Sequence, residues 1–166
     1  MHISLYFLHD KRKITHRSWI LDYRIRIFCI FYGKMNCFIH WKNVTLIFSK
    51  VDIDDRNAMK KRISRIKAER KMSASDVLTL HENMNNFERK LEQFYEPVAK
   101  NVDSIFFIMD GSAYYDIEVD EDEWIRINVE RGDLIIIPRG RNYRFTLTTQ
   151  NKVVVERFFD ADTQQG

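Results

Sequence analysis

The side chain that says most about chemistry in this 166-residue chain is Tyr143, which closes the segment Gly132–Tyr143. The segment reads Gly, five residues, Pro-x-Gly, two residues and then the tyrosine, a pattern that predicts a buried strand followed by a turn. No histidine follows His81, so a metal site in the second half of the chain would have to rely on acids, with Glu96 and Asp103 as the candidates. Imidazole and carboxylate together suit borderline divalent metals, whereas two acids without imidazole suit a hard cation. The second half of the chain therefore lacks the side chains that a borderline metal would need.

The pattern of Gly132–Tyr143 is similar to the second sequence motif of cupin barrels, where the last position is normally a metal-binding histidine. Other short segments occur in a fixed order, with spacings that need no gaps, and together they resemble the eukaryotic form of acireductone dioxygenase, a methionine-salvage enzyme. These segments are Phe94-Tyr95-Glu96, Met109–Asp116, Trp124–Ile127, Glu130–Asp133 and Tyr143–Thr146. The resemblance runs from about Phe48 to about Phe159. It implies a mainly β fold with N-terminal helices, in which the strands form a cupin-type jelly-roll β-barrel.

The resemblance also implies where a metal site would lie. Members of this family bind one Fe or Ni ion through three histidines and one glutamate. Matched residue by residue, the first three ligand positions fall on Val98, Lys100 and Ser104, and the fourth falls on Tyr143. A further position, which usually carries an arginine that helps to position the substrate, falls on Phe106.

Each of these replacements can be judged by its chemistry. Val98 has no lone pair, and Lys100 is a cation that repels a divalent metal. Ser104 offers a neutral hydroxyl, and a phenol such as Tyr143 has an unperturbed pKa of about 10. We therefore expect no catalytic residues, no metal ligands and no cofactor, with Lys100 and Tyr143 facing each other in a remnant pocket.

Three hypotheses of function stay open at this point. The first is an inactive relative of acireductone dioxygenase, a pseudoenzyme that keeps the barrel as a binding or regulatory module for a protein partner or a small anionic ligand. The second is an active dioxygenase that holds Fe or Ni in a non-standard site, recruiting Tyr143, Asp103 or His81. It would convert the acireductone 1,2-dihydroxy-3-keto-5-methylthiopentene to formate and the 2-keto acid precursor of methionine. The third is a degenerate gene product without a selected role.

Charge is divided unevenly along the chain, which carries a formal net charge of +3. Residues 1–50 hold 9 Lys and Arg against 2 Asp and Glu, so the remaining residues are mildly acidic. A nucleic-acid-binding face would need clustered Lys and Arg, so we expect no nucleic-acid partner. Cys29 and Cys37 are the only cysteines, too few for a disulfide framework or a zinc site. We expect a monomer without a membrane span. The family resemblance favours the cytoplasm and leaves the nucleus open as a second location.

The predicted domain organisation has three parts. Residues 1–47 form an unrecognised N-terminal extension, residues 48–160 form the barrel domain, and residues 161–166 form a tail. Within the extension, Ile25–Tyr32 could form a strand or an aggregation-prone segment, whereas the charges between Trp19 and Trp41 argue against a membrane helix. The extension is either a membrane-surface or partner-binding segment, or an unusual or mispredicted N-terminus.

Periodicity predicts helices within residues 55–96 and barrel strands over about 104–159. The expected helices are 56–71, a segment that begins at Ser73 and carries His81 at its end, and 85–95. The expected strands are 105–109, 113–119, 124–129, 134–137, 143–147 and 152–159. Asp110-Gly111, between the first two strands, is expected to form a hairpin turn.

Overall fold

The computed structural model describes residues 4–7, 13–15, 25–32, 34–41 and 44–161, with side chains from Val44 onward. Its two helices and eleven strands are, in chain order, β1 (Ser4–Phe7), β2 (Lys13–Thr15), β3 (Ile25–Tyr32), β4 (Lys34–Trp41), β5 (Val44–Lys50), α1 (Arg56–Glu69), β6 (Ala74–His81), α2 (Phe87–Tyr95), β7 (Ser104–Asp120), β8 (Glu123–Glu130), β9 (Asp133–Ile137), β10 (Tyr143–Leu147) and β11 (Lys152–Phe159). The mainly β architecture that the sequence predicts is confirmed.

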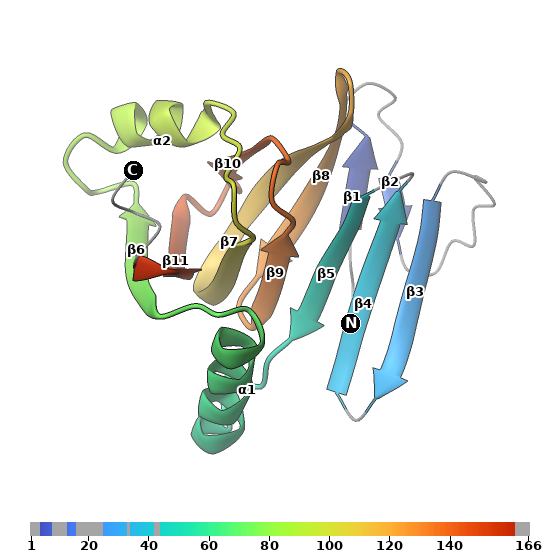
Figure 1. Cartoon of the computed structure of the whole chain (residues 1–166). Helices are drawn as coiled ribbons and strands as arrows, with labels where there is room; N and C mark the ends of the chain where they lie inside the picture. Colours follow the sequence, from blue (N-terminus) through green and yellow to red (C-terminus); the bar gives the residue numbers. More distant parts are fainter. Residues whose placement is uncertain (1–3, 8–12, 16–24, 33, 42–43, 162–166) are drawn as a thin grey trace.

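The longest strand, β7, is shared by two antiparallel sheets. Its first half pairs with β9 and β11, and its second half pairs with β8 and β10. One sheet continues from β9 through β5 and β4 to β3, which lie side by side in Figure 1, and on its other side from β11 to β6. The other sheet continues from β8 to β1 and β2. The predicted strand at Ile25–Tyr32 is thus confirmed as β3.

The main hydrophobic core lies between the two sheets, and a second core lies under α1. Along β7, Phe106 and Ile108 belong to the first core, whereas Ile105 and Phe107 belong to the second, where Ile66 of α1 packs against them. Successive side chains of a strand point to opposite faces, so a strand covered on both faces is apolar throughout. This explains why all five residues of β9 are buried.

The helices predicted at 56–71 and 85–95 are confirmed as α1 and α2. Asp55 caps α1, since its carboxylate accepts hydrogen bonds from the amides of Asn57 and Ala58. α2 places Phe87, Leu91 and Phe94 against the main core at the end of the barrel where β10 begins. Among the described residues, neither helix is long and apolar enough to cross a membrane.

The helix predicted to begin at Ser73 is wrong, because the segment forms β6 and places His81 at the end of a strand. All eight residues of β6 pair with β11, and Leu78 and Leu80 alternate with exposed neighbours. Asp76 and the apolar residues also fit an amphipathic helix, so local sequence left the choice open. The pairing with β11, more than 70 residues away, decides it.

The hairpin predicted at Asp110-Gly111 is also wrong, because β7 runs through it as one strand of 17 residues. Gly111 has a φ of +75°, and a Cβ there would lie 2.1 Å from the carbonyl oxygen of Lys152. The register of β7 against β11 shifts at this place, which marks a bulge. The Asp-Gly pair therefore bends the strand from one sheet into the other.

The predicted boundary at residue 48 falls inside β5, and the division into extension, domain and tail stays a prediction. Residues 162–166 of the tail lie outside the described residues, as do parts of the extension.

Candidate functional site

A cavity of about 370 Å³ opens at the end of the barrel that α2 covers. Its walls come from β6, α2, the segment between α2 and β7, and the ends of β7, β10 and β11. Apolar side chains, Phe94, Phe106 and Phe145 among them, make up about half of its lining, and charged and hydroxyl-bearing side chains make up most of the rest. Concave, mostly apolar sites of this size with a few polar groups are typical of small-molecule pockets.

All five positions singled out in the sequence line this one cavity, namely Val98, Lys100, Ser104, Phe106 and Tyr143. Residues 96–103 lead from α2 into β7, and this segment is held against β10 by two reciprocal backbone hydrogen bonds. The amide of Val98 donates to the carbonyl of Tyr143 over 2.9 Å, and the amide of Tyr143 donates back over 3.0 Å. Pro138 and Gly140 end β9 and turn the chain so that Tyr143 begins β10 beside this segment.

The hydroxyl of Tyr143 makes its hydrogen bond inside the cavity wall. Ser104 Oγ donates to Tyr143 Oη over 3.2 Å, and both residues are buried. Burial raises the pKa of the Tyr143 phenol above its ordinary value, which the bond from Ser104 only partly opposes. The phenol is therefore neutral near pH 7 and is poorly suited to bind a metal as phenolate.

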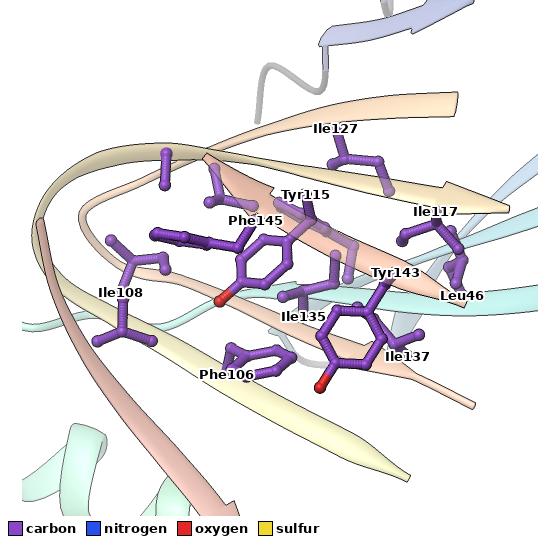
Figure 2. Packing of buried hydrophobic residues seen from close by; sticks show 14 of the residues in the cluster. Leu46, Phe106, Ile108, Tyr115, Ile117, Ile127, Ile135, Ile137, Tyr143 and Phe145 are labelled. Atoms are coloured by element: carbon purple, nitrogen blue, oxygen red, sulfur yellow. The ribbon is translucent and has the colours of Figure 1, made fainter. Parts of the chain in front are cut away.

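Phe106, which stands at the position of the substrate-positioning arginine, packs between two tyrosines. Its ring stacks on Tyr115 with centroids 4.7 Å apart and meets the edge of Tyr143 at 5.6 Å. Figure 2 shows the hydroxyls of both tyrosines on the Phe106 side of the aromatic cluster. An uncharged ring thus occupies a place where the family resemblance implies a cation.

Lys100 lies at the exposed rim of the cavity, where its side chain contributes positive charge near Asp76. Its backbone carbonyl accepts a hydrogen bond from the amide of Gly140 over 2.8 Å, which ties the rim to the turn before β10. Lys100 and Tyr143 therefore do line one pocket. The expectation that they face each other directly stays a prediction.

Several polar residues of the cavity were not predicted from the sequence, among them Tyr115 on β7 and Arg157 on β11. Strand alternation could have found both, because Tyr115 lies two residues from the buried Ile117, and Arg157 two residues from the buried Val155. Burial raises the pKa of Tyr115 well above its ordinary value. Arg157 forms a bidentate ion pair with Asp76, at 2.8 and 2.6 Å, and this bond holds the pKa of Asp76 below its ordinary value.

Asp103 and His81, the candidates for a different metal site, are not available for one. Asp103 pairs with Arg70 at 2.7 Å, and its other oxygen accepts the amide of Arg139 at 3.1 Å. His81 is exposed at the end of β6 and does not line the cavity. Within the part of the chain that the structure describes, no three His, Cys, Asp or Glu side chains gather as a metal site would require.

The donor set of the cavity does not fit Fe or Ni. These ions are held in proteins by imidazole and carboxylate groups, and the four matched positions offer a valine, a lysine, a serine hydroxyl and a neutral phenol. A lysine at the rim would also repel a divalent cation. The cavity is thus shaped for a ligand but is chemically unsuited to the metal.

Comparisons with known proteins agree with this geometry. The model of the ARD/ARD′ family matches residues 34–165. A Caenorhabditis elegans protein named "Probable inactive acireductone dioxygenase 1" is 48% identical over 112 residues, which cover 68% of this chain and 70% of that protein. The acireductone dioxygenase of Monodelphis domestica is 36% identical over 121 residues, covering 72% of this chain and 67% of that protein.

A solved structure supports the same fold. It is that of an acireductone dioxygenase from Bacillus anthracis with a cadmium ion in its active center, and it superposes with a TM-score of 0.71. The alignment covers 96% of this chain and 92% of that chain, at 22% sequence identity. The likeness confirms the cupin-type barrel that the sequence predicts.

Proposed function

Since this chain belongs to the ARD/ARD′ family, we propose that it is a member that keeps the barrel and has lost the dioxygenase reaction. In this proposal the barrel serves as a binding or regulatory module. The observation that carries it is the content of the cavity wall, where the four matched ligand positions hold Val98, Lys100, Ser104 and Tyr143. The name of the Caenorhabditis elegans relative, "Probable inactive acireductone dioxygenase 1", supports the same conclusion.

The alternative, an active enzyme with a non-standard metal site, finds less support in the same geometry. Each of its candidate ligands is compromised in a different way. Tyr143 has a raised pKa and a bonded hydroxyl, Asp103 has both oxygens engaged, and His81 lies outside the cavity. Recruiting them would break an ion pair and move a strand end.

Turnover and metal content test this proposal directly. The purified chain would be supplied with Fe(II) or Ni(II), acireductone and O₂, with the Monodelphis domestica enzyme assayed in parallel as the active control. We expect no enzyme-dependent loss of acireductone and less than stoichiometric metal after desalting. Turnover, or stoichiometric metal that is lost in Tyr143→Phe, would overturn the proposal in favour of the alternative.

A restoration variant would show whether the lost ligands are the cause. It would carry Val98→His, Lys100→His, Ser104→Glu and Tyr143→His together. We expect this variant to retain one equivalent of Ni(II) where the parent chain retains none, because the four side chains of the family site are then present. Equal metal content in the two proteins would mean that the lost ligands do not explain the lack of metal.

We also propose that the chain is a monomer, and that it works in the cytoplasm or the nucleus, the location that the family resemblance implies. Imaging of a tagged chain and sedimentation of the purified protein would test these two points. Recovery in a membrane fraction, or a dimer at micromolar concentration, would contradict them.

A further inference from the structure

Tyr115 is the most buried polar residue in the cavity wall, and its hydroxyl has no hydrogen-bond partner among the described residues. The residue is 2% exposed, and among the side chains that the structure describes none forms a hydrogen bond with this hydroxyl. The hydroxyl oxygen is not fully enclosed by protein atoms, and the residue lines the cavity, so the hydroxyl reaches the cavity space. In the free protein water can reach this hydroxyl, and a bound acceptor would take the place of that water.

Two further donors reach the same space. Tyr143 accepts its bond from Ser104, which leaves the hydrogen of its own hydroxyl to donate. Arg157 uses Nε and Nη2 on Asp76, which leaves Nη1 without a partner among the described residues. The positive charge of Arg157 lies close enough to both tyrosine hydroxyls to oppose the rise in their pKa.

The acids of the wall leave this donor set available. Asp76 is held by Arg157, and Asp103 is held by Arg70 and the amide of Arg139. Glu96 is exposed at the rim, on the same segment as Lys100. The interior therefore offers donors, whereas its negative groups are paired or lie at the mouth. A singly charged acceptor fits this balance better than a doubly charged phosphate, which would meet Asp76 and Glu96.

We propose that the cavity binds a small carboxylic acid with an apolar body, whose carboxylate accepts hydrogen bonds from Tyr115, Tyr143 and Arg157 without any metal. The apolar body would pack on Phe94, Phe106 and Phe145, which line the remaining wall. Charge-assisted hydrogen bonds of this kind are the strong ones, and the apolar lining adds affinity through buried area. This inference rests on the proposed function, since it gives the metal-free cavity its ligand class.

Binding of 3-phenylpropionate to the full chain in the presence of EDTA tests the proposal. Amide chemical shifts or calorimetry would be compared with two controls, 3-phenylpropanol, which keeps the body without the charge, and acetate, which keeps the charge without the body. We expect saturable binding of the acid, with the alcohol and acetate each at least about 10-fold weaker, as loss of charge-assisted bonds or of the apolar contact implies. No saturation by the acid up to 10 mM, or equal binding of the alcohol, would overturn the proposal.

Removing single hydroxyls locates the carboxylate. Tyr115→Phe and Tyr143→Phe each keep the ring, and we expect each to weaken 3-phenylpropionate binding about 10-fold. Tyr114→Phe is the matched control on the opposite face of the same strand, and it should leave the affinity unchanged. Should one cavity variant fail to unfold cooperatively, the other carries the test.

The outcomes separate this inference from the proposed function. Cavity variants that bind as tightly as the control variant would overturn the carboxylate site, whatever the turnover assay gives. Turnover with bound metal would overturn the proposed function, whatever 3-phenylpropionate does in EDTA.

Discussion

Two neighbouring residues of β7, Tyr115 and Asp116, show opposite ways of burying a polar group. Tyr115 faces the cavity and its hydroxyl has no partner among the described side chains. Asp116 points to the opposite face of the strand and is also buried, and its carboxylate accepts hydrogen bonds from Arg126 at 2.6 and 2.8 Å and from Arg144 at 3.1 Å. The guanidinium of Arg144 is itself sandwiched between Tyr95 and Trp124, at 4.4 and 4.7 Å from their ring centres.

The difference teaches which polar groups stabilise the fold and which are kept for a ligand. The Asp116 cluster is complete without any bound molecule, so its bonds contribute to the free energy of folding. The Tyr115 hydroxyl bonds to none of the described side chains, so it adds little to the free energy of folding and is available to a bound acceptor. Four measurements can break or sharpen this contrast, and they are given from the largest expected effect to the smallest.

Asp116→Ala should have the largest effect, because it leaves two guanidinium groups beside each other without their shared acceptor. We expect a loss of about 3 kcal/mol in the free energy of unfolding, measured by urea titration. The matched control is Asp110→Ala on the same strand, whose pair with Lys152 is well exposed and should be worth less than about 1 kcal/mol. Equal losses in the two variants would mean that the buried cluster is no more important than a surface pair.

Asp133 is a second buried acid, and it has weaker compensation for its burial than Asp116. One lysine and one backbone amide contact it, whereas two arginines bond to Asp116. Burial raises its pKa to about 6, although Lys50 Nζ lies 3.0 Å away and the amide of Glu130 donates to it, because burial outweighs both. In the unfolded chain the group ionises near its ordinary pKa of 3.8. As pH rises between these two values the unfolded state loses its proton first, so the free energy of unfolding falls, and it levels off above about pH 6.

Asp133→Asn should remove this dependence. We expect the difference in free energy of unfolding, variant minus parent, to increase by about 2 kcal/mol from pH 4 to pH 7. Asp110→Asn is the opposite control, because Lys152 holds the pKa of Asp110 below its ordinary value and the parent is then favoured as pH rises. A parallel pH profile for Asp133→Asn and the parent would show that burial does not raise the pKa of Asp133.

Tyr143→Phe should cost about 1 kcal/mol, because it removes the acceptor of the bond from Ser104 in a buried place. Thermal and urea unfolding of the variant would measure it. The comparison is with Tyr115→Phe, which also removes a phenol oxygen from the cavity but loses no hydrogen bond to a described side chain.

Tyr115→Phe should have the smallest effect on stability, within about 0.5 kcal/mol of the parent, or a slight gain, because no bond is lost. The contrast with Tyr143→Phe is the sharpest one, since both substitutions remove one phenol oxygen from the same cavity. A loss at Tyr115 as large as that at Tyr143 would indicate that the Tyr115 hydroxyl has a partner after all.

Much of the barrel could be predicted because its signals are local. An apolar run marks β9, alternation of apolar and polar residues marks β10, and the strand predicted at 152–159 coincides with β11. The spacing of the family segments was enough to bring five positions to one cavity. For the strands, residues near in sequence contain the decisive information, whereas the cavity positions followed from the family resemblance.

The two wrong predictions of secondary structure lie where pairing with a distant strand determines the conformation. β6 forms a strand because β11 lies beside it, and Asp110-Gly111 continues a strand because both halves of β7 find partners. The special state of Tyr115 could not be predicted either, since a missing hydrogen bond depends on every neighbour that fails to supply one. Strand alternation in the local sequence can predict that Tyr115 points inward, but it cannot predict whether its hydroxyl finds a hydrogen-bond partner.

The bend at Gly111 has a consequence for how the barrel opens. Because one unbroken strand serves both sheets, neither sheet can separate from the other without tearing its own ladder. Slow hydrogen exchange should therefore be shared by the amides on both sides of Gly111, and these amides should exchange only when the whole barrel opens. A ligand held by Tyr115 would slow that exchange in both sheets at once, so occupancy of the cavity could be followed from backbone amides far from it.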